Sequence, residues 1–433
     1  MMRFVLGVLA TACLALTPSA EQPNIVLILV DDGGSGDLSC YGSNRIATPA
    51  IDSIASAGVR FTQAYASSSV GGPARAGLLT GRYQQRFGFE YNVPRGCGGE
   101  GLPQAEATTP EGLGAAGYRS ILVGKWHLGC SAEQHPLAHG FDDFFGFLGA
   151  ARPYEAFEGD ESQRLLLGRE PYPESFAYLT TEFAQRAVAY IEEHADKRFF
   201  LCLAPNAVHR PLQARADLLT RARLDHANES DERQRAIALM MSVDALVNDV
   251  LTALAAEGLT ENTLVCFAHD NGGASKNGSS NGALRGFKGS PYEGGVRVPL
   301  VMQWPAVLPA GRDFDAPVSL LDLHATAWSA AKLEPSAERP LDGVDLVPYL
   351  TGEREGRPHE TLFWRRGEMW AIRHGDWKLL GYPGIPTPEL FDLARDPGES
   401  TNRFVDEPEL VDELRKRFLL WHRSLSEPAW DGQ

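Results

Sequence analysis

The sequence predicts an α/β fold in which a large, mostly parallel sheet is sandwiched by helices, followed by a smaller C-terminal α+β domain. Three observations predict it. Continuous apolar, β-branched runs such as residues 24–30 are typical of strands buried on both faces. These runs alternate with helical segments, which favours parallel strands joined by crossover helices. After about residue 340 the pattern changes to short strands separated by glycine and charged turns, which indicates a short antiparallel sheet.

Local signals define the elements of the larger domain in order. The first strand, at 24–30, ends in two aspartates and two glycines. Thr48 and Pro49 then provide an N-cap and a first-turn proline for a helix that Gly58 ends. Apolar runs and helical periodicity predict further strands at 59–66, 118–124, 198–203, 262–268 and 299–303, and further helices at 73–81, 109–117, 176–194 and 232–256.

The last part of the chain predicts a separate arrangement. Three short apolar segments, at 361–364, 369–373 and 377–380, are predicted to form the small antiparallel sheet. A final helix is predicted at 408–424. We therefore divide the chain into a signal peptide at 1–20, a large domain at 21–340 and a smaller C-terminal domain at 341–433.

The composition excludes some classes of partner. The chain has 433 residues and a formal net charge of -16, with no long basic run. This charge argues against nucleic acid and anionic membrane surfaces as partners. An anionic ligand must therefore be bound by a local cluster of cations.

The N-terminus indicates export. Arg3 precedes an apolar segment at 4–16, and a small-residue cleavage site lies at 18–20. We expect a periplasmic or secreted protein. A lipoprotein attached through Cys13 is the less favoured alternative, because residues 10–12 make a poor lipobox. No later segment is long and apolar enough to predict a transmembrane helix.

Several motifs carry a family resemblance. The run SSSVGGPARAGLLTGR occupies 67–82, and GYRSILVGKWH occupies 117–127. Further matches are NIVLILVDD from Asn24, AHDNGG around Asp270, and LRGFKGSPYEGGVRVP at 284–299. Together these runs resemble the sulfatase family of the alkaline phosphatase superfamily. The resemblance covers nearly the whole mature chain and implies an arylsulfatase or carbohydrate sulfatase, a hydrolase of sulfuric esters.

Four oxygen-bearing side chains follow two predicted strands: Asp31, Asp32, Asp270 and Asn271. Binding sites in open α/β sheets form at such carboxyl ends. Carboxylate and amide oxygens favour calcium or magnesium over zinc. Each motif taken alone can also be an ordinary turn, because the same residue types favour turns. The resemblance implies that all four bind a cation, Ca²⁺ in preference to Mg²⁺.

The resemblance also implies a cationic cluster made of Arg75, Lys125, His127, His209 and Lys288. In the family, residues at these places hold the nucleophile, bind the sulfate oxygens and protonate the leaving alcohol. We assign Arg75 to the nucleophile loop, both lysines to the sulfate, and both histidines to acid and base roles. Without the resemblance, each lysine would be interpreted as a solvated surface charge and each histidine as a structural residue.

One position departs from the family pattern. The signature nucleophile is Cys or Ser, which is converted to formylglycine, and Gly71 stands in its place. Glycine has no side chain to oxidise, so formylglycine cannot form and the normal mechanism is blocked. Substitution by Ser69 is disfavoured because Ser69 lies two residues upstream and Pro73 restrains the loop.

Three functions remain open. The first is hydrolysis of a sulfated carbohydrate or an aryl sulfate by a reduced or altered mechanism. The second is a catalytically inactive pseudo-sulfatase that binds sulfated glycans. The third is a phosphate or phosphonate ester hydrolase of the same superfamily, which shares the metal ligands and the cations. We expect substrate specificity in loops at 153–173 and 382–388.

Overall fold

The computed structural model describes residues 22–94, 99–157, 159–173 and 175–432, so the predicted signal peptide lies outside it. Its centre is an 11-stranded sheet. The strands are β1 (Asn24–Val30), β2 (Val59–Tyr65), β3 (Arg119–Lys125), β4 (Asp143–Phe147), β5 (Leu166–Leu167), β6 (Glu170–Pro171), β7 (Phe199–Ala204), β8 (Thr263–His269), β9 (Arg297–Gln303), β10 (Arg312–Phe314) and β11 (Val318–Ser319).

The strand order is β10-β2-β9-β8-β1-β7-β3-β4-β5-β6, with β11 paired to β2. The central run from β8 to β4 is parallel throughout. Strand β9 is antiparallel to both of its neighbours, and β5 and β6 form an antiparallel edge. The prediction of a mostly parallel sheet is confirmed.

The described part of the chain contains ten α-helices. They are α1 (Pro49–Ala57), α2 (Gly71–Thr80), α3 (Thr109–Ala115), α4 (Leu179–Glu193), α5 (Ala216–Asp225), α6 (Asp231–Ala256), α7 (Glu293–Val296), α8 (Asp322–Ala330), α9 (Val347–Thr351) and α10 (Pro408–His422).

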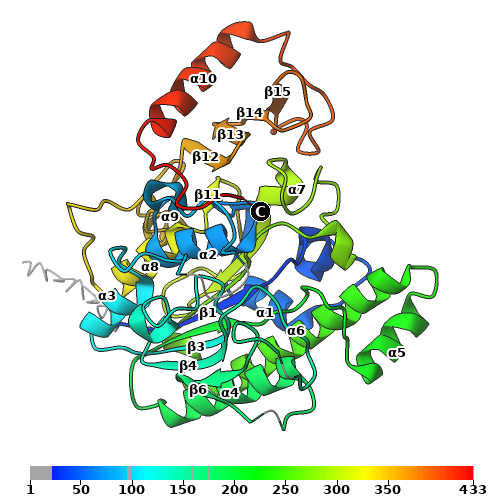
Figure 1. The fold of residues 1–433 in the computed structure, drawn as a ribbon, viewed down its shortest axis with the longest axis vertical. Coiled ribbons are helices and arrows are strands. Elements are labelled where there is room, and N and C mark those ends of the chain that lie inside the picture. Colours follow the sequence, from blue (N-terminus) through cyan, green and yellow to red (C-terminus); the bar gives the residue numbers. More distant parts are fainter. Residues whose placement is uncertain (1–21, 95–98, 158, 174, 433) are drawn as a thin grey trace, which may run out of the picture.

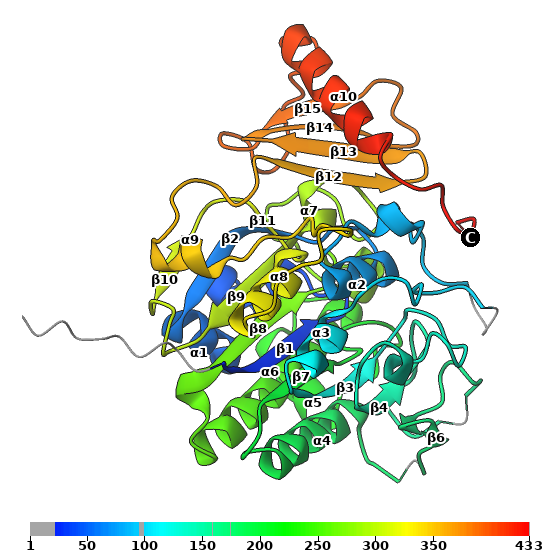
Figure 2. The ribbon, with the colours of Figure 1, turned by 90° about the vertical axis from the view of Figure 1, so that its left-hand side faces the viewer.

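The central strand β1 is buried on both faces because helices lie on each side of the sheet (Figure 2). Its odd-numbered apolar residues pack in a core with α2, α3 and α8, and its even-numbered ones pack with α1, α4 and α6. This explains why the strand is a continuous apolar run rather than an alternating one.

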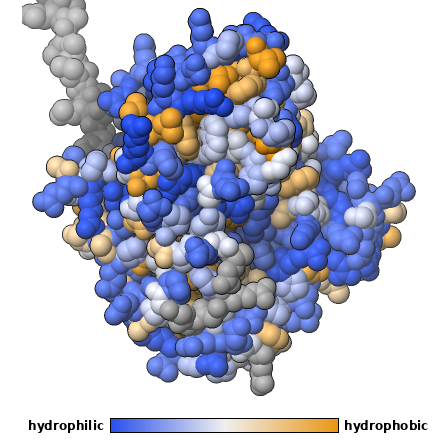
Figure 3. Space-filling view, turned by 45° about the horizontal axis from the view of Figure 1, so that its top comes forward, coloured by the Kyte–Doolittle hydropathy of each residue, from blue (hydrophilic) through white to orange (hydrophobic). Residues whose placement is uncertain are grey.

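The prediction that no later segment is long and apolar enough to cross a membrane is corrected for helix α6, which meets that test by length and composition alone. However, 67% of its most apolar window is buried inside the protein, where it packs against α1, α4 and α5. Burial against the sheet accounts for its hydrophobicity. The surface in Figure 3 is mainly hydrophilic on the side shown, with hydrophobic residues gathered in its upper part.

The C-terminal segment forms a 4-stranded antiparallel sheet of β12 (Thr361–Arg366), β13 (Met369–His374), β14 (Trp377–Gly381) and β15 (Glu389–Asp392). Helix α10 packs on one face through Val411, Leu414 and Phe418. The other face contacts the main body, where Trp364 Nε1 donates to the carbonyl of Ala66 at 2.8 Å. Figure 1 shows this sheet above the large sheet, as the predicted fold class requires. Strand β15 was not predicted.

Candidate active site

The predicted site residues come together at the carboxyl edge of four adjacent parallel strands, β8, β1, β7 and β3. The segments that supply them are the ends of these strands, the start of α2 and the loop before α7. Parallel strands present their carboxyl ends at one edge, so residues far apart in sequence meet there. Helix α2 begins at Gly71 rather than at Pro73, so the nucleophile position is its first residue.

Two buried aspartates follow β1, and each is paired with a lysine. Lys125 Nζ lies 2.6 Å from Asp31 Oδ2, and Lys288 Nζ lies 2.7 Å from Asp32 Oδ1. Burial alone would raise the pKa of Asp31, but Lys125 and the other nearby cations outweigh it and hold that pKa well below its ordinary value. Burial lowers the pKa of Lys125, and Asp31 opposes this shift. Asp31 is therefore anionic at neutral pH.

The third carboxylate is bound by the signature arginine. Arg75 Nε and Nη2 lie 3.0 and 2.9 Å from Asp270 Oδ2, and Arg75 Nη1 donates to the Lys125 carbonyl at 3.3 Å. The other oxygen, Asp270 Oδ1, accepts the N–H of Asp32 at 3.3 Å. Burial raises the pKa of Asp270, and Arg75 opposes this shift. Arg75 thus fixes the carboxylate that faces the nucleophile position.

Asp32 has a left-handed backbone, with φ of 63°, which is unfavourable for a residue with a side chain. Its hydrogen bonds hold it there. Asn271 Nδ2 and Asn277 Nδ2 donate to its two carboxylate oxygens at 2.9 Å each, and Ser279 Oγ donates to its carbonyl at 2.9 Å. Sequence reasoning missed Asn277 and Ser279, because they lie in a stretch rich in Gly, Ser and Asn that has the composition of a plain loop.

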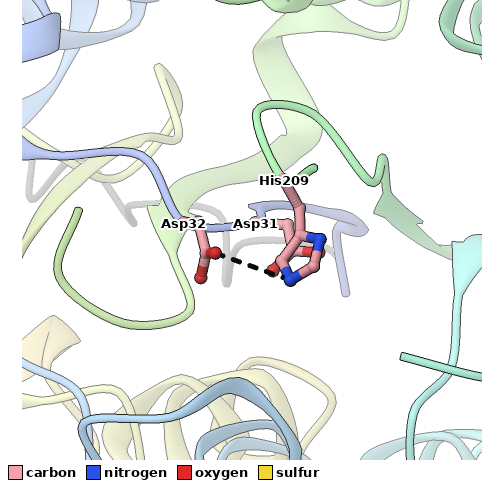
Figure 4. Close-up of side chains that lie close together, drawn as sticks. All are labelled: Asp31, Asp32 and His209. Carbon is pink, nitrogen blue, oxygen red and sulfur yellow. Dashed lines mark ion pairs between the residues drawn. The ribbon is translucent and has the colours of Figure 1, made fainter. Parts of the chain in front are cut away.

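His209 lies at the mouth of the site. Its Nε2 is 3.6 Å from Asp32 Oδ2, and its Nδ1 donates to the Arg210 carbonyl at 2.9 Å. Figure 4 shows the imidazole beside Asp31 and Asp32. One potential ligand atom from each of these three side chains lies within 4.8 Å of the others. His209 is therefore close enough to contact either a bound cation or a ligand above it.

His127 is buried against the same cluster, and its backbone φ is 64°. Burial, followed by repulsion from Lys125 and Arg75, lowers its pKa well below the ordinary value. Neither ring nitrogen has a hydrogen-bond partner among the described residues. The imidazole is therefore neutral and has free polar atoms inside the site.

The oxygen donors fit a hard cation. Asp31 Oδ1 and Asn271 Oδ1 are buried and have no hydrogen-bond partner in the described part of the chain. Buried oxygens are normally satisfied, and a cation such as calcium satisfies carboxylate and amide oxygens directly. The side chains that would hold it are Asp31, Asp32, Asp270 and Asn271.

Gly71 faces these donors directly. An ideal Cβ at this position would lie 2.7 Å from Asp270 Oδ2 and 3.4 Å from Asn271 Oδ1. The residue is buried at the start of α2, and the following N–H, of Gly72, donates to Asn92 Oδ1 at 3.0 Å. The hydroxyl of Ser69 contacts Met369 Sδ at 3.9 Å, on the small sheet. This contact gives no support to Ser69 as a replacement nucleophile.

Comparison with known proteins identifies the family. The sequence profile described as "Sulfatase" matches residues 23–333. The chain belongs to the sulfatase family. A second profile, "N-sulphoglucosamine sulphohydrolase, C-terminal", matches residues 288–423 of this sulfatase-family protein.

Individual relatives cover almost the whole chain. The N-acetylgalactosamine-6-sulfatase of Canis lupus familiaris is 33% identical over 95% of this chain and 87% of its own length. Arylsulfatase H of Homo sapiens is 31% identical over 92% of this chain and 90% of its own. Among solved structures, Ps i-CgsB in complex with k-i-k-neocarrahexaose is 30% identical, with a TM-score of 0.89 and 95% of each chain covered.

The same fold extends to more distant proteins. The phosphonate monoester hydrolase of Agrobacterium radiobacter matches with a TM-score of 0.67 over 93% of this chain and 96% of its own, at 21% identity. At that identity the likeness concerns the fold alone.

Proposed function

We propose that this sulfatase-family protein binds a sulfated carbohydrate at a calcium site and releases sulfate at a rate near background. One observation carries the proposal: the carboxylates and cations of the site are assembled around Gly71, which has no side chain to act as a nucleophile. Removing a catalytic nucleophile costs about 10⁶-fold in rate in other hydrolases, while the rest of the site still binds.

The sulfate group would be held by charge. Lys125 and Lys288 each form an ion pair with one aspartate of the site, and His209 lies at its mouth. A calcium ion on the four oxygen ligands would neutralise those carboxylates and attract the sulfate oxygens. The two lysines would then be free to contact the anion. His209, partly exposed, would contact the alcohol oxygen that joins sulfate to sugar.

The substrate class rests on the relatives. A sulfated sugar as the ligand is supported by the relatives named N-acetylgalactosamine-6-sulfatase and by the similar structure in complex with a neocarrahexaose. The arylsulfatase relatives support an aryl sulfate as a second possibility. Export through the predicted signal peptide belongs to the same proposal, because sulfated polysaccharides lie outside the cell.

The first test measures binding and turnover separately. Isothermal titration of the purified protein with N-acetylgalactosamine 6-sulfate should give binding that requires calcium and is lost in Lys125→Met. Sulfate release from the same sugar should stay near background. The Gly71→Cys variant, produced together with the formylglycine-generating enzyme, should release sulfate faster.

Three outcomes separate the alternatives. Turnover by the wild type at or above the rate of the formylglycine variant would show that the chain hydrolyses sulfate esters by another mechanism, and would overturn the proposal. Faster phosphate than sulfate release from matched aryl esters would identify a phosphate or phosphonate ester hydrolase. Absence of calcium-dependent binding to any sulfated sugar would contradict the binding function itself.

A further inference from the structure

We infer that Arg366 binds a second anionic group, a sulfate or a carboxylate, on the sugar next to the one whose sulfate occupies the pocket. The inference rests on the proposed function, since it extends the same ligand beyond the pocket. It makes Arg366 a specificity-determining residue and the ligand an oligosaccharide with at least two negative charges.

Arg366 lies at the edge of the site. It ends β12, the strand of the small sheet nearest to the main body (Figure 2). Its Nη2 donates to the carbonyl of Gly289 at 2.8 Å. Gly289 follows Lys288 directly, and its own N–H donates to the carbonyl of Ser69 at 2.8 Å. The guanidinium therefore contacts the residue after Lys288, and that same residue bonds the segment leading into Gly71.

The hairpin that carries Arg366 is fixed in place. The neighbouring Arg365 forms two hydrogen bonds to Glu90, from Nε at 2.8 Å and from Nη2 at 3.0 Å. Glu90 also accepts the N–H of Gly367 at 3.2 Å, and Met369 contacts Ser69. A side chain on such a rigid support loses little entropy when it binds a ligand.

Arg366 also lacks a counter-charge. Within the described ranges no carboxylate forms an ion pair with it, whereas Arg365 is paired with Glu90. Burial lowers the pKa of Arg366, and the Tyr382 and Tyr91 hydroxyls oppose this shift. The side chain is half-buried and still reaches solvent.

A guanidinium that is partly removed from water without an anion is unfavourable. Arg366 has five N–H donors, and one donates to the Gly289 carbonyl. The remaining donors form a planar fork that matches the oxygens of a sulfate or a carboxylate. An anionic ligand would supply the negative charge that the Arg366 guanidinium lacks among the described residues. Because the chain as a whole carries a net charge of -16, such a local cation is where an anionic ligand would bind.

The surroundings suit a sugar. Two tyrosines lie near the strand that carries Arg366: the Tyr91 hydroxyl lies against Gly367, the next residue, and Tyr382 packs against the cluster that contains Trp364 of the same strand. Tyrosine offers an apolar ring face and a polar hydroxyl, a combination that fits a pyranose ring. Tyr382 opens the 382–388 turn, where the sequence already predicted substrate specificity.

The test compares three disaccharides in the presence of calcium. Each contains 6-sulfated N-acetylgalactosamine, joined to a neutral hexose, to a uronic acid or to a sulfated hexose. By isothermal titration the wild type should bind the two dianionic sugars about tenfold more tightly than the monoanionic one, as a partly exposed charge-assisted contact predicts. If only one dianionic sugar bound more tightly, it would identify the second group as a carboxylate or a sulfate.

Three variants isolate Arg366. Arg366→Gln should lose the preference for dianionic sugars and keep the affinity for the monoanionic one within about twofold. Arg366→Lys should keep part of the preference, because it retains the charge without the fork. Arg339→Gln is the control for overall charge, since Arg339 is exposed in a loop, and it should behave as the wild type. Melting temperatures of all variants report on folding.

Equal binding of the three sugars by the wild type would overturn this inference and leave the proposed function intact. An equal loss of affinity for all three sugars in Arg366→Gln would also overturn it, because Arg366 would then only position the Gly289 loop. If the wild type bound none of the three, the proposed function would fail and this inference with it.

Discussion

Replacing Gly71 with alanine tests whether the site has adapted to a position without a side chain. The added Cβ would lie 2.7 Å from Asp270 Oδ2, closer than the 3.0 Å below which atoms must shift. Asp270 cannot yield freely, because Arg75 binds the same oxygen from Nε and Nη2. Overpacking of this kind costs about 1–3 kcal/mol. Alanine regains about 0.5–1 kcal/mol from the lower entropy of the unfolded chain.

The expected net effect of Gly71→Ala is a loss of up to about 2.5 kcal/mol, seen as a lower melting temperature. The matched control is Gly114→Ala, also in a helix, where an added Cβ meets nothing within 4 Å. That variant should be equally stable or slightly more stable than the wild type. Thermal unfolding by calorimetry measures both. A Gly71→Ala protein as stable as Gly114→Ala would refute the reasoning.

Three further predictions concern charge and metal. Lys125→Met leaves the buried Asp31 without its lysine, so the free energy of unfolding measured by urea titration should fall by about 3–5 kcal/mol. In the control Lys276→Met, at an exposed lysine, it should change by less than about 0.5 kcal/mol. Calcium at 100 times its Kd should stabilise the wild type by about 2.7 kcal/mol in calorimetry, and EGTA should reverse this stabilisation. The stabilisation should be absent in Asp31→Asn, and an unchanged response in that variant would exclude Asp31 as a ligand. Burial, opposed by Lys378 and assisted by Glu293, raises the pKa of Glu399 from 4.5 to about 7. Its contribution to stability is therefore full below pH 4.5 and is lost as pH rises through about 7, so melting temperature should fall across this window and fall less in Glu399→Gln.

The elements with strong local signals were predicted well. Residues 24–30 form β1, and the helix predicted from the Thr48-Pro49 signal is α1, Pro49–Ala57. Helix α5 and strand β15 were missed because their signals are weak. Helix α5 is short and mostly polar, and β15 has four residues after a proline-rich turn. Such segments adopt their structure through packing against neighbours that a single sequence does not display.

The ten predicted site residues were found by motif, and the structure shows how they contact one another. Sequence reasoning assigned Arg75 to the nucleophile loop, and its observed hydrogen bonds are to Asp270 and the Lys125 carbonyl. It gave no signal for Asn277, which binds Asp32, or for Arg366, which reaches the Lys288 loop from another sheet. Those contacts depend on how loops and the two sheets meet.

The sequence by itself determined the fold class, the family and the residue types of the site, because apolar periodicity and short motifs are local properties. It also determined that Gly71 carries no nucleophile. Only the tertiary structure decided which lysine pairs with which aspartate, how closely Asp270 approaches Gly71, and that Arg366 bonds the Gly289 carbonyl without an ion pair to any described residue. The reason is physical: charge pairing and steric fit depend on distances of a few ångströms between segments that the chain order leaves far apart.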